Sequence, residues 1–102
     1  MPKFLIKWEM NSCMFPVDPE QQGKLMSSLF QMVKEDEKAG ACLNWAMFPE
    51  TSRGISFTNQ NEEELAARLM KYSPYIMFKV KPLLSLDQAM RAFQKAVESR
   101  KK

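Results

Sequence analysis

Histidine is absent from this sequence of 102 residues, and cysteine and glycine are scarce. Without histidine the chain cannot form a serine–histidine catalytic triad, a zinc site with histidine ligands, or a histidine-ligated haem or iron centre. The two cysteines, Cys13 and Cys42, are far apart in the sequence and form no C-x-x-C motif. We therefore expect two reduced thiols in a cytoplasmic protein, with no metal site and no cofactor.

Long apolar runs and a basic folded face are also lacking. No stretch approaches the ~18 consecutive apolar residues of a membrane-spanning helix, and Lys3, Lys7 and Glu9 argue against a signal peptide in the first ten residues. Residues 100–102 account for the whole excess of 15 basic over 12 acidic side chains. A nucleic-acid interface needs basic residues clustered on a folded face. We therefore expect neither a membrane nor a nucleic acid as partner.

What the chain does contain is enough apolar material for one folded unit. Hydrophobic residues make up 45% of the sequence and aromatic residues 11%, an ordinary composition for a globular domain of this length. There is no internal repeat and no linker-like stretch. We expect a single domain over residues 1–102, with a core at 3–82 and a C-terminal helix at 86–99.

Four segments alternate between apolar and polar side chains, which is the period of a β-strand. They lie at residues 3–10, about 41–48, 53–59 and 75–82. The alternation predicts an inward face made of Phe4, Ile6, Trp8, Leu43, Trp45, Ile55, Phe57, Ile76, Phe78 and Val80. The opposite face would then be mixed in character and carry Leu5, Lys7, Glu9, Cys42, Asn44, Ala46, Phe48, Ser56, Thr58, Tyr75, Met77, Lys79 and Lys81. Its apolar members favour at least partial cover.

Three further segments combine helical spacing of apolar residues with a capping signal. Asp18-Pro19 begins a helix that ends near Gly40, and Asn61-x-x-Glu64 begins a second that ends at Ser73-Pro74. Ser85-x-x-Gln88 begins the last. We expect this last helix to be a packing element, because its apolar residues share one stripe: Leu86, Met90, Phe93 and Val97. Whether it packs in its own protomer or across a dimer stays open.

The order of these elements is strand, helix, strand, strand, helix, strand, helix. Two strand–helix–strand units joined by a hairpin predict a ferredoxin-like α+β fold. Right-handed crossovers would give an antiparallel sheet of order 4-1-3-2, with the first two helices on one face. The other face would be solvated or would meet a second copy of the chain.

The chain resembles the dimeric α+β barrel superfamily, in which two ferredoxin-like protomers pack sheet to sheet. Within it the chain is similar to a family of small uncharacterised bacterial proteins, through Phe4-x-Ile6-x-Trp8, the stretch Gly40 to Trp45, Gly54-x-Ser56-Phe57 and Phe78-Lys79-Val80-x-Pro82-Leu83-Leu84. More distantly it resembles the muconolactone isomerases, through Asp18-Pro19, Asn44-Trp45 and Pro74-Tyr75-Ile76-Met77. The resemblance implies a homodimer and a pocket between the sheet and the helices. It brings no matching set of catalytic residues.

Lys7 and Glu9 are two residues apart on the first strand, so their side chains project from the same side of the sheet. In a dry pocket such a pair could move a proton beside a carbonyl group. An isomerase-like hypothesis therefore takes Lys7, Glu9 and Tyr75 as catalytic residues, with Asn44 orienting the substrate. The alternative is that Lys7 and Glu9 form a charge pair at a dimer seam.

Four residues are candidates for lining a ligand pocket: Trp8, Asn44, Trp45 and Tyr72. Aromatic residues on an inward face are also ordinary core residues, so both interpretations stand. Two functions follow from the sequence. One is binding of a small organic molecule without a cofactor, with or without isomerase-like chemistry. The other is a non-catalytic homodimeric module whose sequence serves folding and association.

Overall fold

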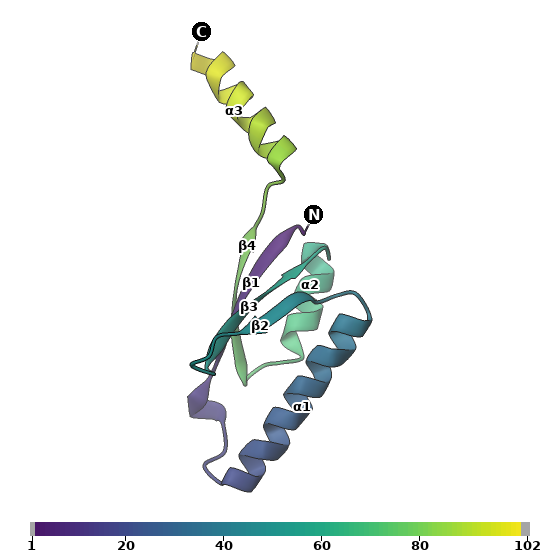
Figure 1. Cartoon of the computed structure of the whole chain (residues 1–102), viewed down its shortest axis with the longest axis vertical. Helices are drawn as coiled ribbons and strands as arrows, with labels where there is room; N and C mark the ends of the chain where they lie inside the picture. The colour runs from purple at the N-terminus through teal and green to yellow at the C-terminus, as the bar shows by residue number, and fades with distance from the viewer. Residues whose placement is uncertain (1, 101–102) are drawn as a thin grey trace.

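The computed structural model describes residues 2–100 as an α+β structure with a four-stranded antiparallel sheet (Figure 1). Its elements are β1 (Phe4–Met10), the short 3-10 turn η1 (Ser12–Met14), α1 (Pro19–Lys38), β2 (Leu43–Met47), β3 (Arg53–Thr58), α2 (Glu62–Met70), β4 (Ile76–Pro82) and α3 (Leu86–Arg100). The α+β class is therefore confirmed.

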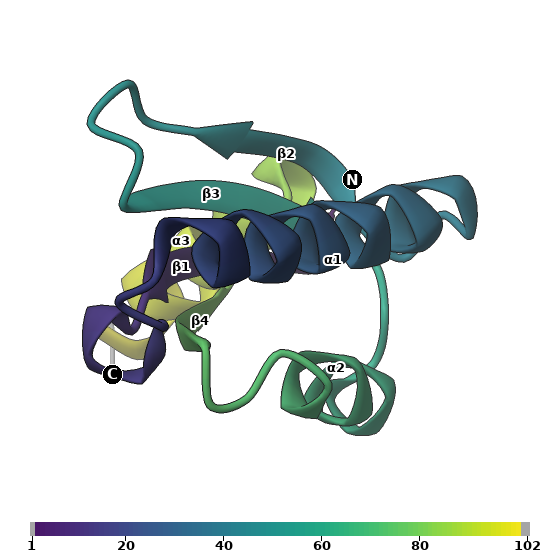
Figure 2. The same ribbon diagram turned by 90° about the horizontal axis from the view of Figure 1, so that it is seen from below.

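The sheet has the strand order β2-β3-β1-β4, and each neighbouring pair is antiparallel. Helices α1 and α2 lie on the same side of the sheet, as Figure 2 shows. We call the side under these helices the inner face and the opposite side the open face. Helix α3 covers neither and projects beyond the end of β4 (Figure 1).

Each helix begins where its capping signal predicts. The Asp18 side chain accepts a hydrogen bond from the Gln21 backbone N–H at 3.0 Å, and Pro19 occupies the first turn of α1. Asn61 and Glu64 exchange the reciprocal bonds of a capping box at α2. Caps of this kind stabilise a helix by about 1 kcal/mol each. At the other end of α1, Gly40 adopts a φ of +79°, which ends the helix at no steric cost.

The predicted faces of β1 and β4 agree with the strand pairing. Ile6 lies opposite Val80 and Trp8 opposite Phe78, all on the inner face. Lys7 lies opposite Lys79 on the open face. Cross-strand partners share a face, so these assignments follow from the register.

The predicted faces of β3 are wrong. Ser56 pairs with Ile6 and Thr58 with Phe4, so both polar residues are on the inner face, where Thr58 is 0% exposed. Its hydroxyl is fully used, because it donates to the Ala41 carbonyl at 2.8 Å and accepts from the Gln60 N–H at 3.1 Å. Ile55 and Phe57 consequently point to the open face. A buried polar group is tolerated when it is hydrogen-bonded.

Gly54 explains why β3 has this register. It lies opposite Trp8, and a Cβ atom added there would clash with the Trp8 indole and with the Ala46 carbonyl oxygen. The inward position on β3 next to the indole must therefore be glycine. Because side chains alternate with a period of two, this choice also turns Ser56 inward and Ile55 outward.

Strand β2 differs from the prediction at its first residues. Cys42 is buried on the inner face, whereas Leu43 pairs with Phe57 on the open face. A β-bulge between Leu43 and Ala46 then shifts the register, with Asn44 at a φ of 48°. The extra residue returns Trp45 to the inner face, where it was predicted.

Candidate functional site

A cavity of about 50 Å³ lies between the inner face of the sheet and the helices α1 and α2. All four strands and both helices contribute to it. Its lining residues are mostly apolar: Trp8, Met10, Met26, Leu29, Phe30, Val33, Cys42, Trp45, Met47, Ser56, Arg68, Leu69, Tyr72, Ile76 and Phe78. Three of the expected ligand-pocket residues, Trp8, Trp45 and Tyr72, are therefore brought together.

Aromatic rings form one wall of this cavity. The Trp8 and Trp45 indoles are stacked, with ring centroids 5.2 Å apart and planes 8° from parallel. Phe30 of α1 meets the Trp45 ring edge-on at 6.2 Å. Such contacts contribute about 0.5–1.5 kcal/mol each beyond the burial of area, so they stabilise this wall.

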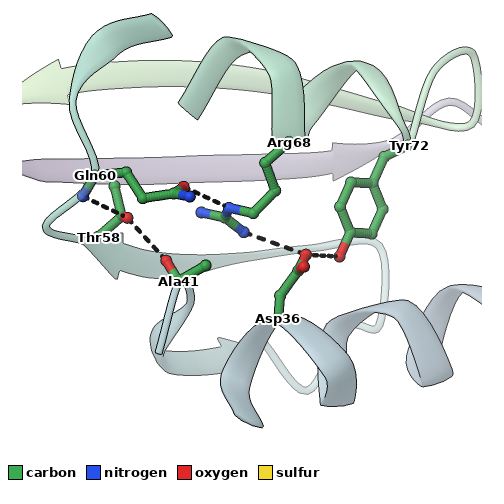
Figure 3. Close-up of polar contacts among 6 residues, drawn as sticks. All are labelled: Asp36, Ala41, Thr58, Gln60, Arg68 and Tyr72. Carbon is green, nitrogen blue, oxygen red and sulfur yellow. Dashed lines mark hydrogen bonds and ion pairs between the residues drawn. The ribbon is translucent and has the colours of Figure 1, made fainter. Parts of the chain in front are cut away.

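A polar cluster beside the cavity connects α1 to α2, and we call it the Asp36 cluster: Asp36, Gln60, Arg68 and Tyr72. Tyr72 Oη donates to Asp36 Oδ2 at 2.6 Å, and Arg68 Nη1 lies 3.5 Å from the same oxygen. Arg68 Nε also donates to Gln60 Oε1 at 2.8 Å. Figure 3 shows Arg68 and Tyr72 converging on Asp36 from opposite sides. The cluster therefore links α1 to α2 through side chains, beside the cavity.

Burial changes the ionisation of two groups in the cavity. Burial, followed by the hydrogen bond to Asp36 and its negative charge, raises the pKa of Tyr72. Burial also raises the pKa of the Cys42 thiol, against the opposing effect of the Arg68 charge. Tyr72 is thus a neutral hydrogen-bond donor at neutral pH, and Cys42 is a protonated thiol rather than a nucleophile.

Two buried donors in the cavity wall have no acceptor. Trp8 Nε1 and Arg68 Nη2 are inaccessible to solvent and make no hydrogen bond in the structure. Both residues line the cavity, and Arg68 as a whole is only 6% exposed. A buried donor left without a partner costs about 1–3 kcal/mol. These two N–H groups are the clearest chemical signal among the side chains that line the cavity, because an acceptor that reached either of them would remove that cost.

The size of the cavity limits what it holds. Its 50 Å³ is well below the ~150 Å³ of an apolar cavity known to admit benzene. Three flexible side chains, Met10, Met26 and Met47, belong to its lining. Methionine adapts its shape more readily than branched or aromatic residues. The cavity as it stands suits a molecule of a few heavy atoms.

The residues expected for catalysis lie elsewhere. Lys7 and Glu9 line a broad hollow of about 600 Å³ on the open face. Tyr75 packs edge-on against Phe15, with ring centroids 6.1 Å apart, and lines neither hollow. Asn44 lies exposed in the β2 bulge. The structure therefore does not bring these four residues to one place.

The open-face hollow has a basic side and a charge-paired side. Arg53 lies 3.6 Å from Glu9 and 3.0 Å from Glu50. These ions are about half exposed, so their pairing contributes little stability. In the part of the chain that the structure describes, Lys7, Lys79 and Lys81 form no salt bridge, although Lys7 and Lys79 are direct cross-strand neighbours.

Sequence reasoning missed Arg68 and Asp36. The sequence does contain a signal for both residues, because each lies at helical spacing from apolar residues on the inward side of its helix. Arg68 follows Leu65 by three residues and precedes Tyr72 by four, and Asp36 follows Val33 by three. A charged residue inside an apolar stripe indicates a buried partner.

Among residues 2–100, no three potential metal ligands cluster together, and no helix is both long and apolar enough to cross a membrane. No protein-family model matches the chain, and no curated protein matches it in sequence.

Proposed function

We propose that this protein binds a small organic molecule, without a cofactor, in the cavity between the sheet and the helices α1 and α2. The observation that carries the proposal is an apolar cavity lined by two side chains, Trp8 and Arg68, each of which has a buried N–H donor without an acceptor among the described residues. A carbonyl or carboxylate oxygen is the acceptor that suits them. The apolar part of the molecule would lie against Trp45 and the methionines.

The proposal is one of binding and not of catalysis. Tyr72 is engaged by Asp36, and its raised pKa keeps it protonated. Cys42 is a buried thiol with a raised pKa. Lys7 and Glu9, the pair expected for proton transfer, line the open face instead. The cavity therefore offers donors and apolar surface but no base.

Titration with small carboxylates tests this function. The indole N–H signals of Trp8 and Trp45 are followed by NMR while formate, acetate or propionate is added. We expect the Trp8 signal to shift and saturate with at least one of these probes. Arg68→Gln should weaken that response about tenfold, whereas Arg91→Gln on the exposed face of α3 should leave it unchanged.

Native mass spectrometry of protein purified without denaturation provides a second readout, since it would reveal a retained molecule as added mass. If no probe shifts the Trp8 signal and no added mass is found, the binding function is wrong.

The open face favours a second function, association as a homodimeric module. Its apolar side chains come from all four strands and the β2–β3 turn: Leu5, Leu43, Ala46, Phe48, Ile55, Phe57 and Met77. No element of the described chain covers them. A contiguous apolar surface of this kind is typical of an interaction site. The strand order and the two helices on one side support a ferredoxin-like topology, in which this face is the one that pairs in a dimeric α+β barrel.

Light scattering after gel filtration, over a series of concentrations, tests the homodimer. We expect the full chain to be a dimer and Ile55→Glu to dissociate it, because the variant places a charge in the centre of the open face. Gln22→Glu, an equal charge change on exposed α1, should remain dimeric. A full chain that is monomeric throughout would overturn the homodimer.

A further inference from the structure

Helix α3 has an apolar stripe that nothing covers. Its first turn is well defined, since Ser85 and Gln88 exchange backbone-to-side-chain hydrogen bonds of 2.8 and 3.1 Å. None of its residues is buried, and Leu86 and Phe93 are 74% and 71% exposed. An isolated helix of this length is marginal in water. The stripe therefore needs a surface to pack on.

The rest of the same protomer does not supply that surface. The inner face of the sheet is already covered by α1 and α2. The exit from β4 is held in place, because the Leu83 N–H donates to the Lys3 carbonyl at 2.8 Å, which extends the pairing of β4 with β1. From there α3 continues along the direction of β4, away from the sheet (Figure 1). The molecule is accordingly elongated, with extents of 64 × 26 × 24 Å.

The open face of the sheet is about as long as helix α3. Helix α3 has 15 residues, which span ~22 Å at 1.5 Å per residue. Strands β1 and β4 have seven residues each, or ~23 Å at 3.3 Å per residue. Among residues 2–100, the stripe and the open face each gather several apolar side chains that no other element covers.

The charges match as well. Asp87 and Glu98 are about three turns apart, so both lie along the same edge of the stripe. Lys79 and Lys81 lie along one edge of the open face, on β4, with Lys7 beside them. Arg91 lies on the same side of the helix but further from the stripe, so a helix placed on this face can set Asp87 and Glu98 against these lysines.

We propose that α3 of each copy packs across the open face of a second copy, in a reciprocal two-fold exchange. This inference rests on the homodimer proposed above, but it differs from the sheet-to-sheet pairing of a dimeric α+β barrel, because the partner's α3 and not the partner's sheet covers the open face. A two-fold axis perpendicular to the long axis, near residues 83–85, brings each α3 over the other copy's sheet. The assembly is closed, and both uncovered surfaces are buried at once. Direct sheet-to-sheet pairing would leave the α3 stripe in water.

Cross-linking between two variants that each carry one exposed cysteine tests the exchange. Cys13 is replaced by serine, and Cys42 stays because it is buried. One protein then carries Phe93→Cys and the other Ile55→Cys, and the mixture is treated with a short bismaleimide. We expect a strong cross-link between the two different proteins and weak cross-linking of either protein alone.

Dimer affinity is a second readout that does not need cysteine. A chain that ends at Leu84 should still fold, because α3 makes no buried contact, and it should be monomeric where the full chain is a dimer. Lys79→Glu with Lys81→Glu should weaken the dimer about tenfold. Adding Asp87→Lys and Glu98→Lys to that variant should restore it.

Three outcomes would overturn the exchange, and they are distinguishable. Ile55-to-Ile55 cross-links, with the truncated chain still dimeric, would mean that two sheets face each other and that the homodimer stands without the exchange. An intramolecular cross-link in a protein with both cysteines, absent from the mixture, would mean that α3 folds back on its own sheet. A monomeric full chain would overturn both the homodimer and the exchange.

Discussion

The two faces of the sheet differ in what β3 contributes to them, since its polar side chains lie on the covered inner face and its apolar side chains on the uncovered open face. On the inner face, β3 contributes Ser56 and Thr58, and on the open face it contributes Ile55 and Phe57. The inner face nevertheless is the packed one, because its polar atoms are hydrogen-bonded and its aromatic rings are stacked. The comparison teaches that burial follows from satisfied contacts as well as from hydropathy.

Removing the carboxylate of the Asp36 cluster should have the largest effect on the inner face. Asp36→Ala leaves Arg68 buried without its charge partner and Tyr72 without its acceptor. We expect the free energy of unfolding to fall by about 3 kcal/mol in urea denaturation. Glu35→Ala on the exposed side of α1 is the control and should change it by less than ~0.5 kcal/mol. Equal effects of the two variants would contradict the role of the cluster.

Filling the position opposite Trp8 should come next. Gly54→Ala forces a methyl group against the indole and a backbone oxygen, and we expect a loss of about 2.5 kcal/mol in thermal or urea unfolding. The matched control is Gly23→Ala in α1, where nothing lies within 4 Å of the added carbon. That variant should stabilise the protein by about 0.5–1 kcal/mol. A neutral Gly54→Ala would show that Gly54 does not set the register of β3.

Making the inner face uniformly apolar should destabilise it. Thr58→Val removes a hydroxyl that bonds to both Ala41 and Gln60 and leaves those two backbone groups without a partner. We expect a loss of about 2 kcal/mol in urea denaturation. Phe57→Thr makes the opposite change on the open face and, in the α3-truncated chain, should cost less than ~1 kcal/mol. A gain in stability from Thr58→Val would mean that the hydropathy of a side chain alone decides how well it is accommodated on the inner face.

The smallest effect is expected from Tyr72→Phe, about 1 kcal/mol at pH 7 through loss of its bond to Asp36. The pKa of Tyr72 is raised above its ordinary value of 10.0, so the unfolded chain loses this proton first as the pH rises. The stability that Tyr72 contributes is therefore fully present below pH 10 and declines above it, by ~1.4 kcal/mol per pH unit. Urea denaturation of both proteins from pH 7 to 11 measures the difference. A difference that is constant to pH 11 would contradict this.

The cavity illustrates how far sequence reasoning reaches. Trp8, Trp45 and Tyr72 were expected to line a pocket, and the structure places all three around one cavity. Arg68, which supplies one of the two free donors, was not anticipated, because its burial depends on Asp36 of another helix. An ion pair between two helices that are far apart in the sequence cannot be recognised from the sequence of either helix alone.

Local signals in the sequence determined the helices, their caps and the inward faces of β1 and β4, because periodicity and capping act between residues a few positions apart. The tertiary structure decided the faces of β2 and β3. In β3 the alternation predicts the wrong side as the inner one, because the approach of Trp8 to Gly54 decides the orientation of the strand, and in β2 the bulge at Asn44 changes the face within the strand. The tertiary structure also left the open face and α3 uncovered, since both surfaces satisfy local rules and only a long-range partner can bury them.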